Sequence, residues 1–387
     1  LRFPEFSGEW VTKSINDLAV VIGGGTPDTT VKSYWDGEIQ WFTPSEIGKN
    51  KYVDSSLRTI TEVGLNNSSA KLLPPNTILL SSRATIGECS LSLRECATNQ
   101  GFQCLVSKKC NVDFLYYLIQ TKKKDLIRKS CGSTFLEISA NEVRKIQVSV
   151  PSDVEQQKIA ELLSLIDERI ATQNKIIEDL KKLKSAISKH LFTRKDLLET
   201  TICLSEIATL RNGYAFQSSK YNALGKWKIL TITNVSGERH INDEDCNCII
   251  NLPDDIQDHQ VLKEGDILIS LTGNVGRVSL CKDGDYLLNQ RVGLLQLAKN
   301  VNQEFLYQIL SSQKFENSMI ACGQGAAQMN IGKGDVESYV LPYSSNGNNI
   351  LWIAKILHSY DECIINEQRR LTLLTMQKQY LLTQMFI

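Results

Sequence analysis

The side chains best suited to bind a ligand are polar residues beside glycines, at corresponding points of the two halves of the chain. Ser81–Gly87 in the first half corresponds to Ser270–Gly276 in the second, and these segments carry Arg83 and Asn274. Guanidinium and amide groups at the end of a strand can hydrogen-bond to base edges or to phosphates. The pattern therefore predicts two loops that contact nucleic acid.

Other polar and aromatic residues near such loops complete the predicted DNA-contacting set. In the first half, the set comprises Thr26, Lys32, Tyr34, Trp41, Ser45, Ser82, Arg83, Thr85, Ser133 and Thr134. In the second half, it comprises Arg211, Tyr214, Asn234, Thr272, Asn274, Arg277, Arg291, Gln324 and Gln328. The amides of Asn99 and Asn289 could pair with adenine. We interpret these two asparagines instead as residues that tie loops together inside the domain.

Two further segments, one rich in glycine and one rich in lysine, have less specific interpretations. Gly23–Pro27 has neither a following Gly-Lys-Ser/Thr nor the G-x-G-x-x-G spacing of a phosphate-binding loop. We expect a flexible turn there, with a close approach of the backbone to a ligand or DNA as the alternative. Lys122–Lys124, with Arg128 and Lys129, predicts a basic helix end. A solvated face is the simpler interpretation of that helix end, and phosphate contact is the alternative.

Motifs for catalysis are not apparent in the sequence. There is no Asn/Asp-Pro-Pro-Tyr/Phe motif of an amino-methyltransferase, no helicase signature and no evident carboxylate cluster for a nuclease metal. The eleven cysteines are scattered without CxxC spacing, and none of the four histidines is grouped with them. We therefore expect reduced thiols, no metal site and no cofactor in this chain. A catalytic Cys–His pair stays open, because no pattern assigns it a position.

The length and charge of the chain limit its class. With 387 residues, two domains are expected. The 43 Lys and Arg balance 43 Asp and Glu, which argues against a simple nucleic-acid-binding protein. A DNA-binding surface must therefore be a local face, helped by a more basic partner. No apolar run reaches the roughly 18–20 residues that span a bilayer, and no signal peptide is evident, so we expect a cytoplasmic protein.

The second half of the chain repeats the first at an offset of about 190 residues. Leu73–Ser81 corresponds to Leu262–Ser270, and Gly87, Asn99-Gln100, Phe114-Leu115-Tyr116 and Pro151 each have a counterpart in the same order. Chance similarity would not stay colinear, so the sequence indicates a tandem duplication.

Each repeat ends in a segment with the apolar spacing of a coiled-coil helix. The first seam consists of Ile159, Leu163, Ile166, Ile170, Ile177, Leu180, Ile187 and Leu191. The second seam consists of Ile353, Leu357, Tyr360, Ile364, Leu371, Leu374, Leu381 and Met385, each 194 residues later. The polar interruptions repeat as well, Gln173 with Glu367 and Lys184 with Lys378. Steps of three and four residues predict two helices packed on each other. Two surface helices, each packed on its own domain, are the alternative.

These features predict a mixed α/β (α+β) fold with two homologous globular domains. The expected division is a globular domain over residues 1–151, a spacer helix over 152–195, a second globular domain over 196–345 and a second spacer helix over 346–387. Ser152-x-x-Glu155 fits a capping box at the start of the first spacer. Single helices are expected over 114–129 and 305–317, and closing strands over 146–150 and 339–341.

Together these features resemble the specificity subunits of type I restriction-modification systems over essentially the whole chain. The resemblance includes Arg2-Phe3-Pro4-Glu5-Phe6 with Trp10, Asn99-Gln100-Gly101, and Glu155–Ala160 after Pro151. It implies two target-recognition domains and two helices in an antiparallel coiled coil with pseudo-twofold symmetry. Each domain would read one half of a split, asymmetric DNA site, and helix length would set the gap. The second spacer departs from the pattern, since it has Asn349–Ala354 where the first has the Glu-Gln pair.

The resemblance also implies partners and places catalysis outside this chain. Two modification subunits using S-adenosylmethionine would dock on the helices, and motor-nuclease subunits using ATP and magnesium would join them. A subunit of a methylation-only system is the nearest alternative. A duplicated coiled-coil scaffold that binds proteins, or an enzyme, are the alternatives from other classes.

Overall fold

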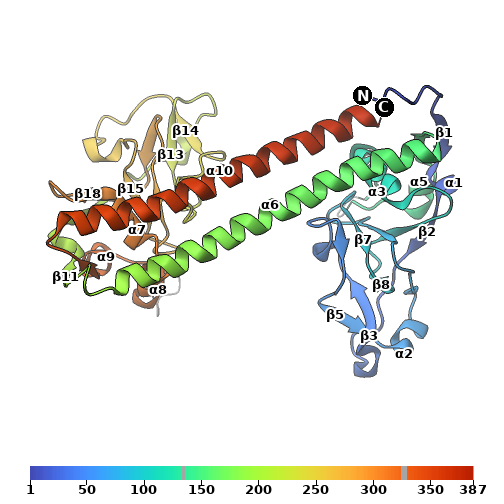
Figure 1. Ribbon diagram of the computed structural model, residues 1–387, viewed down its shortest axis with the longest axis horizontal. Coiled ribbons are helices and arrows are strands. Elements are labelled where there is room, and N and C mark those ends of the chain that lie inside the picture. Colours follow the sequence, from blue (N-terminus) through green and yellow to red (C-terminus); the bar gives the residue numbers. More distant parts are fainter. Residues whose placement is uncertain (133–135, 324–328, 387) are drawn as a thin grey trace. The chain divides into compact units, whose positions relative to one another are not determined.

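The computed structural model describes residues 1–132, 136–323 and 329–386, which form two compact units. The first unit contains Leu1–Asn174 and Arg369–Ile387, and the second contains Lys175–Gln368. Both long helices, α6 (Asp153–Thr193) and α10 (Gly347–Met385), are therefore divided between the units (Figure 1). The division of the chain at residues 151, 195 and 345 stays a prediction.

The first unit is built on a five-stranded and a three-stranded sheet. The larger sheet has the order β2-β9-β6-β7-β4 and consists of Ala19–Gly23, Gln103–Ser107, Ile78–Leu80, Cys89–Ser92 and Tyr52–Val53. The smaller has the order β5-β3-β8 and consists of Arg58–Ile60, Trp35–Phe42 and Cys96–Thr98. A separate antiparallel pair joins β1 (Val11–Ser14) to β10 (Gln147–Val150), directly before α6. Short helices complete this unit: α1 (Ile15–Leu18), α2 (Glu62–Asn66) and α5 (Ala140–Arg144).

The second unit repeats this plan with a four-stranded and a three-stranded sheet. The larger has the order β12-β18-β15-β16 and consists of Ala208–Asn212, Val292–Leu297, Ile267–Ser270 and Val278–Leu280. The smaller has the order β14-β13-β17 and consists of Asn247–Ile249, Trp227–Leu230 and Tyr286–Leu288. The pair of β11 (Thr200–Cys203) with β19 (Val340–Tyr343) corresponds to β1 with β10, and α9 is Lys333–Glu337. The predicted duplication is thus visible in the topology.

The predicted single helices over 114–129 and 305–317 are wrong, because each is a pair of shorter helices. They are α3 (Val112–Thr121) with α4 (Lys123–Arg128), and α7 (Gln303–Leu310) with α8 (Gln313–Cys322). In the second pair the chain breaks at Ser312, which has an extended backbone and whose hydroxyl accepts from the Phe315 N–H at 3.4 Å. A serine cap of this kind starts a new helix.

The core of each unit joins the larger sheet, the repeated helix and both long helices. Phe114–Ile119 of α3 is buried in one cluster with Leu163 of α6 and Met385 of α10. In the second unit Phe305–Tyr307 of α7 is buried with Leu191 of α6 and Ile353 of α10. The start of one long helix therefore lies beside the end of the other, so that the two run antiparallel within each unit.

All sixteen predicted seam residues are buried or half-buried. Buried are Ile159, Leu163, Ile166, Ile177, Leu191, Ile353, Leu357, Ile364, Leu381 and Met385. Half-buried are Ile170, Leu180, Ile187, Tyr360, Leu371 and Leu374. Burial of these positions agrees with the periodicity that predicted the helices.

The predicted capping box at the start of α6 is only half formed. The Glu155 N–H donates to the Ser152 hydroxyl at 3.4 Å, as expected. The Glu155 carboxylate instead accepts two hydrogen bonds of 2.7 Å from Arg2 and one of 3.3 Å from the Trp10 indole. The N-terminal segment thus binds the Glu155 carboxylate, which in a complete capping box would accept from the backbone N–H of Ser152. At the corresponding point of α10, Asn349 donates to the Leu197 carbonyl at 3.0 Å.

Candidate nucleic-acid interface

A single turn in the first unit, Thr98–Gly101, holds three of the predicted DNA-contacting segments together. The Gly25 N–H donates to the Thr98 carbonyl at 2.8 Å, and the Asn99 N–H donates to the Phe42 carbonyl at 3.0 Å. The Ser82 N–H donates to the Gly101 carbonyl at 2.8 Å. Segments carrying Thr26, Ser45 and Arg83 therefore border one turn, which we call the central turn.

The second unit has the same arrangement around its own central turn, Leu288–Arg291. The Tyr214 N–H donates to the Leu288 carbonyl at 2.8 Å, and the Leu271 N–H donates to the Arg291 carbonyl at 3.0 Å. The Asn289 N–H donates to the Leu230 carbonyl at 3.3 Å. Segments carrying Tyr214, Thr272 and Arg291 therefore border this turn.

The paired asparagines shape these turns, as expected. The Asn99 Oδ1 accepts from the Gly101 N–H at 2.8 Å, and the Asn289 Oδ1 accepts from the Arg291 N–H at 3.3 Å. Each side chain thus satisfies a backbone donor two residues later, which is the bond pattern of an Asx turn.

Gly24 and Gly25 of the Gly23–Pro27 segment pack closely against neighbouring residues, and the expected flexibility of this turn stays a prediction. A Cβ on Gly24 would lie 1.9 Å from the Asn99 carbonyl oxygen, and a Cβ on Gly25 would lie 2.2 Å from the Ser69 hydroxyl. Gly213 repeats the contact, since its Cβ would lie 2.2 Å from the Asn289 carbonyl oxygen. Glycine is therefore needed at both places so that a strand end can lie against the central turn.

Arg83 lies at the edge of the first central turn and is partly accessible. Its guanidinium forms an ion pair of 2.9 Å with Glu137, and the two side chains are 42% and 38% exposed. The two residues also form a backbone bridge. An arginine held this way can exchange a carboxylate for a base edge or a phosphate.

Arg277 does not occupy the place of Arg83 in the second unit. The bridge that Arg83 forms with Glu137 is matched there by a bridge of Thr272 with Asn330. Arg277 forms a 3.5 Å ion pair with Glu316 of α8. In the first unit the same loop-to-helix link has opposite charges, Glu88 with Lys123 of α4. Arg277 therefore links its loop to a helix of its own unit.

Three predicted contacts are not supported by the structure, because the side chains are buried. Ser82 lies inside the first domain, and the buried Trp41 indole donates to the Gly25 carbonyl at 2.9 Å. Asn234 accepts from the Thr231 N–H at 2.7 Å and donates to the Asn242 carbonyl at 2.8 Å. Its amide is used to close a turn, and amides that complete turns are common in loops.

The remaining predicted residues of the first unit lie on two surfaces. The hydroxyl of Thr26 donates to the Gln100 side chain on the central turn, and Ser45 lies 3.1 Å from the Thr43 hydroxyl. Thr85 is exposed next to Arg83. The short helix η1 (Lys32–Tyr34), which carries two predicted residues, instead leads into β3 of the smaller sheet. Ser133 and Thr134 lie outside the described residues.

In the second unit, Arg211 lies on β12 and Tyr214 follows that strand, whereas Asn274 lies between β15 and β16 and Arg291 lies between β17 and β18. Arg211 donates to the Gln296 side chain at 2.8 Å, and the Tyr214 hydroxyl donates to Asp255 at 2.8 Å. Asn274 and Arg291 are exposed. Gln324 and Gln328 lie outside the described residues.

Sequence reasoning missed Arg58 of β5. Its guanidinium lies 3.5 Å from the centre of the Trp35 ring, and Trp35 packs edge-on against Trp41 with ring centres 5.1 Å apart. An arginine stacked on an indole is held in place without a carboxylate partner. Trp35 and Trp41, six residues apart in the sequence, were the available signal.

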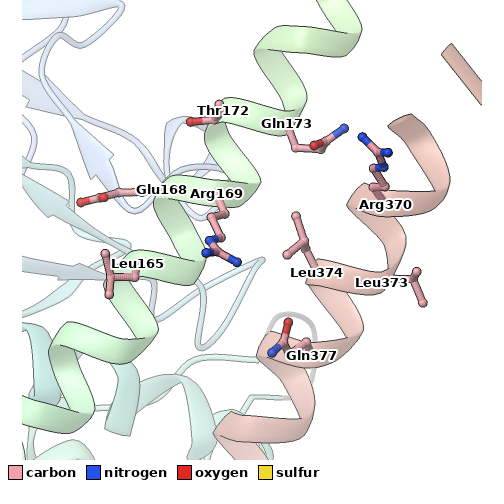
Figure 2. Close-up of a pocket in the computed structure, with 9 residues that line it drawn as sticks. All are labelled: Leu165, Glu168, Arg169, Thr172, Gln173, Arg370, Leu373, Leu374 and Gln377. Carbon is pink, nitrogen blue, oxygen red and sulfur yellow. The ribbon is translucent and has the colours of Figure 1, made fainter. Parts of the chain in front are cut away.

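The helix pair of the first unit carries a groove that is separate from the recognition loops. It is lined by Leu165, Glu168, Arg169, Thr172, Gln173, Arg370, Leu373, Leu374 and Gln377. Figure 2 shows Arg169 and Gln173 pointing toward α10, with Leu374 pointing toward α6. Leu165 and Leu373 at its rim are 57% and 65% exposed.

The described residues offer no group of three or more His, Cys, Asp or Glu that could hold a metal ion. The eleven cysteines, all within the described ranges, are free thiols. Burial raises the pKa of Cys89, Cys104 and Cys281 to about 12, which keeps these thiols protonated. Across the same ranges, no helix has both the length and the hydropathy needed to cross a membrane.

One known protein family matches both halves of the chain, in agreement with the duplicated fold. The family described as "Type I restriction modification DNA specificity domain" matches residues 7–182 and again residues 199–376. The chain belongs to this family. The predicted resemblance to specificity subunits is therefore confirmed, and so is the mixed α/β fold with two domains and two long helices.

Individual relatives and solved structures agree with the family assignment. The chain is 39% identical over 189 residues to the MjaIX specificity subunit of Methanocaldococcus jannaschii, covering 48% of this chain and 44% of that protein. It is 31% identical over 206 residues to the EcoR124I/EcoR124II specificity subunit of Escherichia coli, covering 51% and 50%. The chain thus spans about half the length of these two relatives. The crystal structure of the M. genitalium S subunit superimposes with a TM-score of 0.58 at 17% identity, covering 100% of this chain and 98% of that one.

Proposed function

We propose that this chain is the DNA-sequence-specificity subunit of a type I restriction-modification complex, in which each recognition domain reads one half of a split DNA site. The observation that carries the proposal is the family match to both repeats. The duplicated central turns support it, because each brings several polar loop segments together in its unit. The side chains around the two turns differ, with Arg83 in one place and Thr272 in the other. Different readers imply an asymmetric site.

The proposal assigns the catalytic steps and their cofactors to partner subunits. Two modification subunits would dock on the long helices and supply the S-adenosylmethionine chemistry, and motor-nuclease subunits would supply the ATP and magnesium chemistry. The exposed leucines Leu165 and Leu373 beside the groove of Figure 2 support a protein-binding role for the helix pair. The complex would act in the cytoplasm. A methylation-only system would use this chain in the same way.

Mapping of methylated adenines tests the proposal directly. The chain would be co-expressed with the modification subunit encoded beside it, and the genome of the host would be sequenced by a single-molecule method. We expect one new motif that consists of two unlike half-sites separated by a fixed gap. Cells that express the modification subunit alone are the control and should lack the motif. A stable complex that adds no methylation would contradict the proposal and favour the scaffold alternative.

A further inference from the structure

A cluster of six polar side chains lies in each unit where the recognition domain meets the long helices. The first cluster consists of Lys51, Asp113, Tyr117, Ser164, Asp167 and Lys378. The second consists of Arg239, Glu304, Gln308, His358, Asp361 and Lys184. Taken in the same order, their members are counterparts in the repeat, since Asp361 follows Asp167 by 194 residues, as Lys378 follows Lys184.

In the first cluster, Asp167 of α6 joins the recognition domain to α10. Its Oδ2 accepts from the Tyr117 hydroxyl of α3 at 2.6 Å, and its Oδ1 lies 2.7 Å from the Lys378 Nζ. Burial and the Asp167 charge raise the pKa of Tyr117, so that the hydroxyl stays protonated and donates. Lys51 adds a second link, because its Nζ lies 2.7 Å from the Ser164 hydroxyl and 2.6 Å from Asp113.

In the second cluster, Asp361 of α10 plays the same part toward α6. Its Oδ1 lies 2.6 Å from the Lys184 Nζ, and its Oδ2 accepts from the Gln308 amide of α7 at 2.6 Å. Arg239 donates to Asp361 at 2.9 Å and to both oxygens of Glu304, and it lies 3.0 Å from His358. The side chains of Arg239 and Asp361 are only 10% and 8% exposed.

The two clusters occupy corresponding positions of the repeat, but most of the residue types at these positions differ. Lysine has become arginine, serine has become histidine and tyrosine has become glutamine, yet an aspartate on one long helix meets a lysine on the other in both units. Buried ion pairs add little net stability compared with apolar packing, and their best-attested use is to fix register and orientation. Apolar side chains alone would let a domain tilt on the helix pair, whereas directional bonds to one carboxylate oppose the tilt.

We propose that Asp167 and Asp361 are positioning residues that fix the angle of each recognition domain on the helix pair. On the proposed function, on which this inference rests, that angle sets how many base pairs separate the two half-sites. One base pair adds about 3.4 Å along the duplex. A small tilt at either cluster is therefore enough to change the gap, because α6 and α10 continue from one unit into the other.

The test is the methylation motif of the full complex that carries Asp361→Asn or Asp167→Asn. We expect unchanged half-site sequences and, among the methylated sites, a new population whose gap is one base pair longer or shorter. Asp54→Asn is the matched control, because Asp54 forms an exposed 2.6 Å ion pair with Arg94, and neither residue belongs to a cluster. The control should keep a single gap. Asp361→Glu, which restores a carboxylate, should narrow the gap distribution again.

Milder variants keep the test decisive if an asparagine variant does not fold. Tyr117→Phe removes only the hydroxyl that bonds Asp167, and Gln308→Ala removes the amide that bonds both Asp361 and Glu304. Lower methylation at a single unchanged gap in all these variants would overturn the inference, because it indicates a purely structural role. A wild-type complex without any split motif would instead overturn the proposed function, so the two failures are distinguishable.

Discussion

The two units share a backbone framework and differ in the side chains mounted on it. Both hold a strand-end glycine against an Asn-Gln turn, Gly24 at Asn99 and Gly213 at Asn289. The ion pair that links the neighbouring loop to a helix has reversed its charges, from Glu88–Lys123 to Arg277–Glu316. The duplication has therefore preserved contacts that backbone geometry requires and has left charged surface pairs free to change.

The largest difference between the units is expected in the stability that is lost when the buried Asp361 or the half-buried Asp167 is replaced. Asp361→Ala would leave Lys184 and the almost fully buried Arg239 without one of their acids, which typically costs about 3–5 kcal/mol. Asp167→Ala would cost less, because Asp167 pairs with one lysine and is 15% exposed. Urea denaturation of both variants measures the two losses. Equal losses of stability would mean that Arg239, the additional cation beside Asp361, adds nothing to the stability of the second unit.

Removal of a strand-end glycine tests the shared part of the framework. Gly24→Ala and Gly213→Ala each place a methyl group within 2.2 Å of a carbonyl oxygen. Overpacking of this kind typically costs about 1–3 kcal/mol, and backbone contacts belong at the upper end. Gly334→Ala is the control, since a Cβ there meets nothing within 4 Å. We expect similar destabilisation from the first two substitutions and none from the control. A tolerated Gly24→Ala would show that the turn can move.

Sequence periodicity predicted the long helices and their seam because a 3.5-residue repeat is local information. The duplication was equally accessible, since corresponding motifs such as Asn99-Gln100 and Asn289-Gln290 keep their order. Contacts between distant residues were not accessible. Nothing local to Lys51 indicates Ser164, 113 residues later, as its partner.

The same limit explains why some residues of the predicted DNA-contacting set have buried side chains. Polar residues beside glycines are common both on reading surfaces and inside turns, and only the fold separates the two. Asn234 closes a turn and Trp41 is buried, although their residue types suit base recognition. The break before α8 could be predicted only by recognising Ser312 as a helix cap. The helical pattern through residues 305–317 conceals this role.

The smallest expected effects concern Arg83 and Arg277, which were both predicted from the sequence to contact DNA. Arg83 borders a central turn, and among the described residues its guanidinium pairs with Glu137, so Arg83→Ala should reduce discrimination at one base pair of one half-site by about 1–3 kcal/mol. Arg277 links its loop to α8 through a partly exposed ion pair, so Arg277→Ala should cost about 0–1 kcal/mol of stability and leave both half-sites unchanged. Methylation motifs of the two variants measure this directly. If Arg83→Ala weakens all sequences equally and lowers only the salt dependence of binding, the arginine contacts phosphate. If Arg277→Ala relaxes the second half-site, the charge reversal between the units has produced a reading residue, and charged surface pairs are then the source of new specificity in this framework.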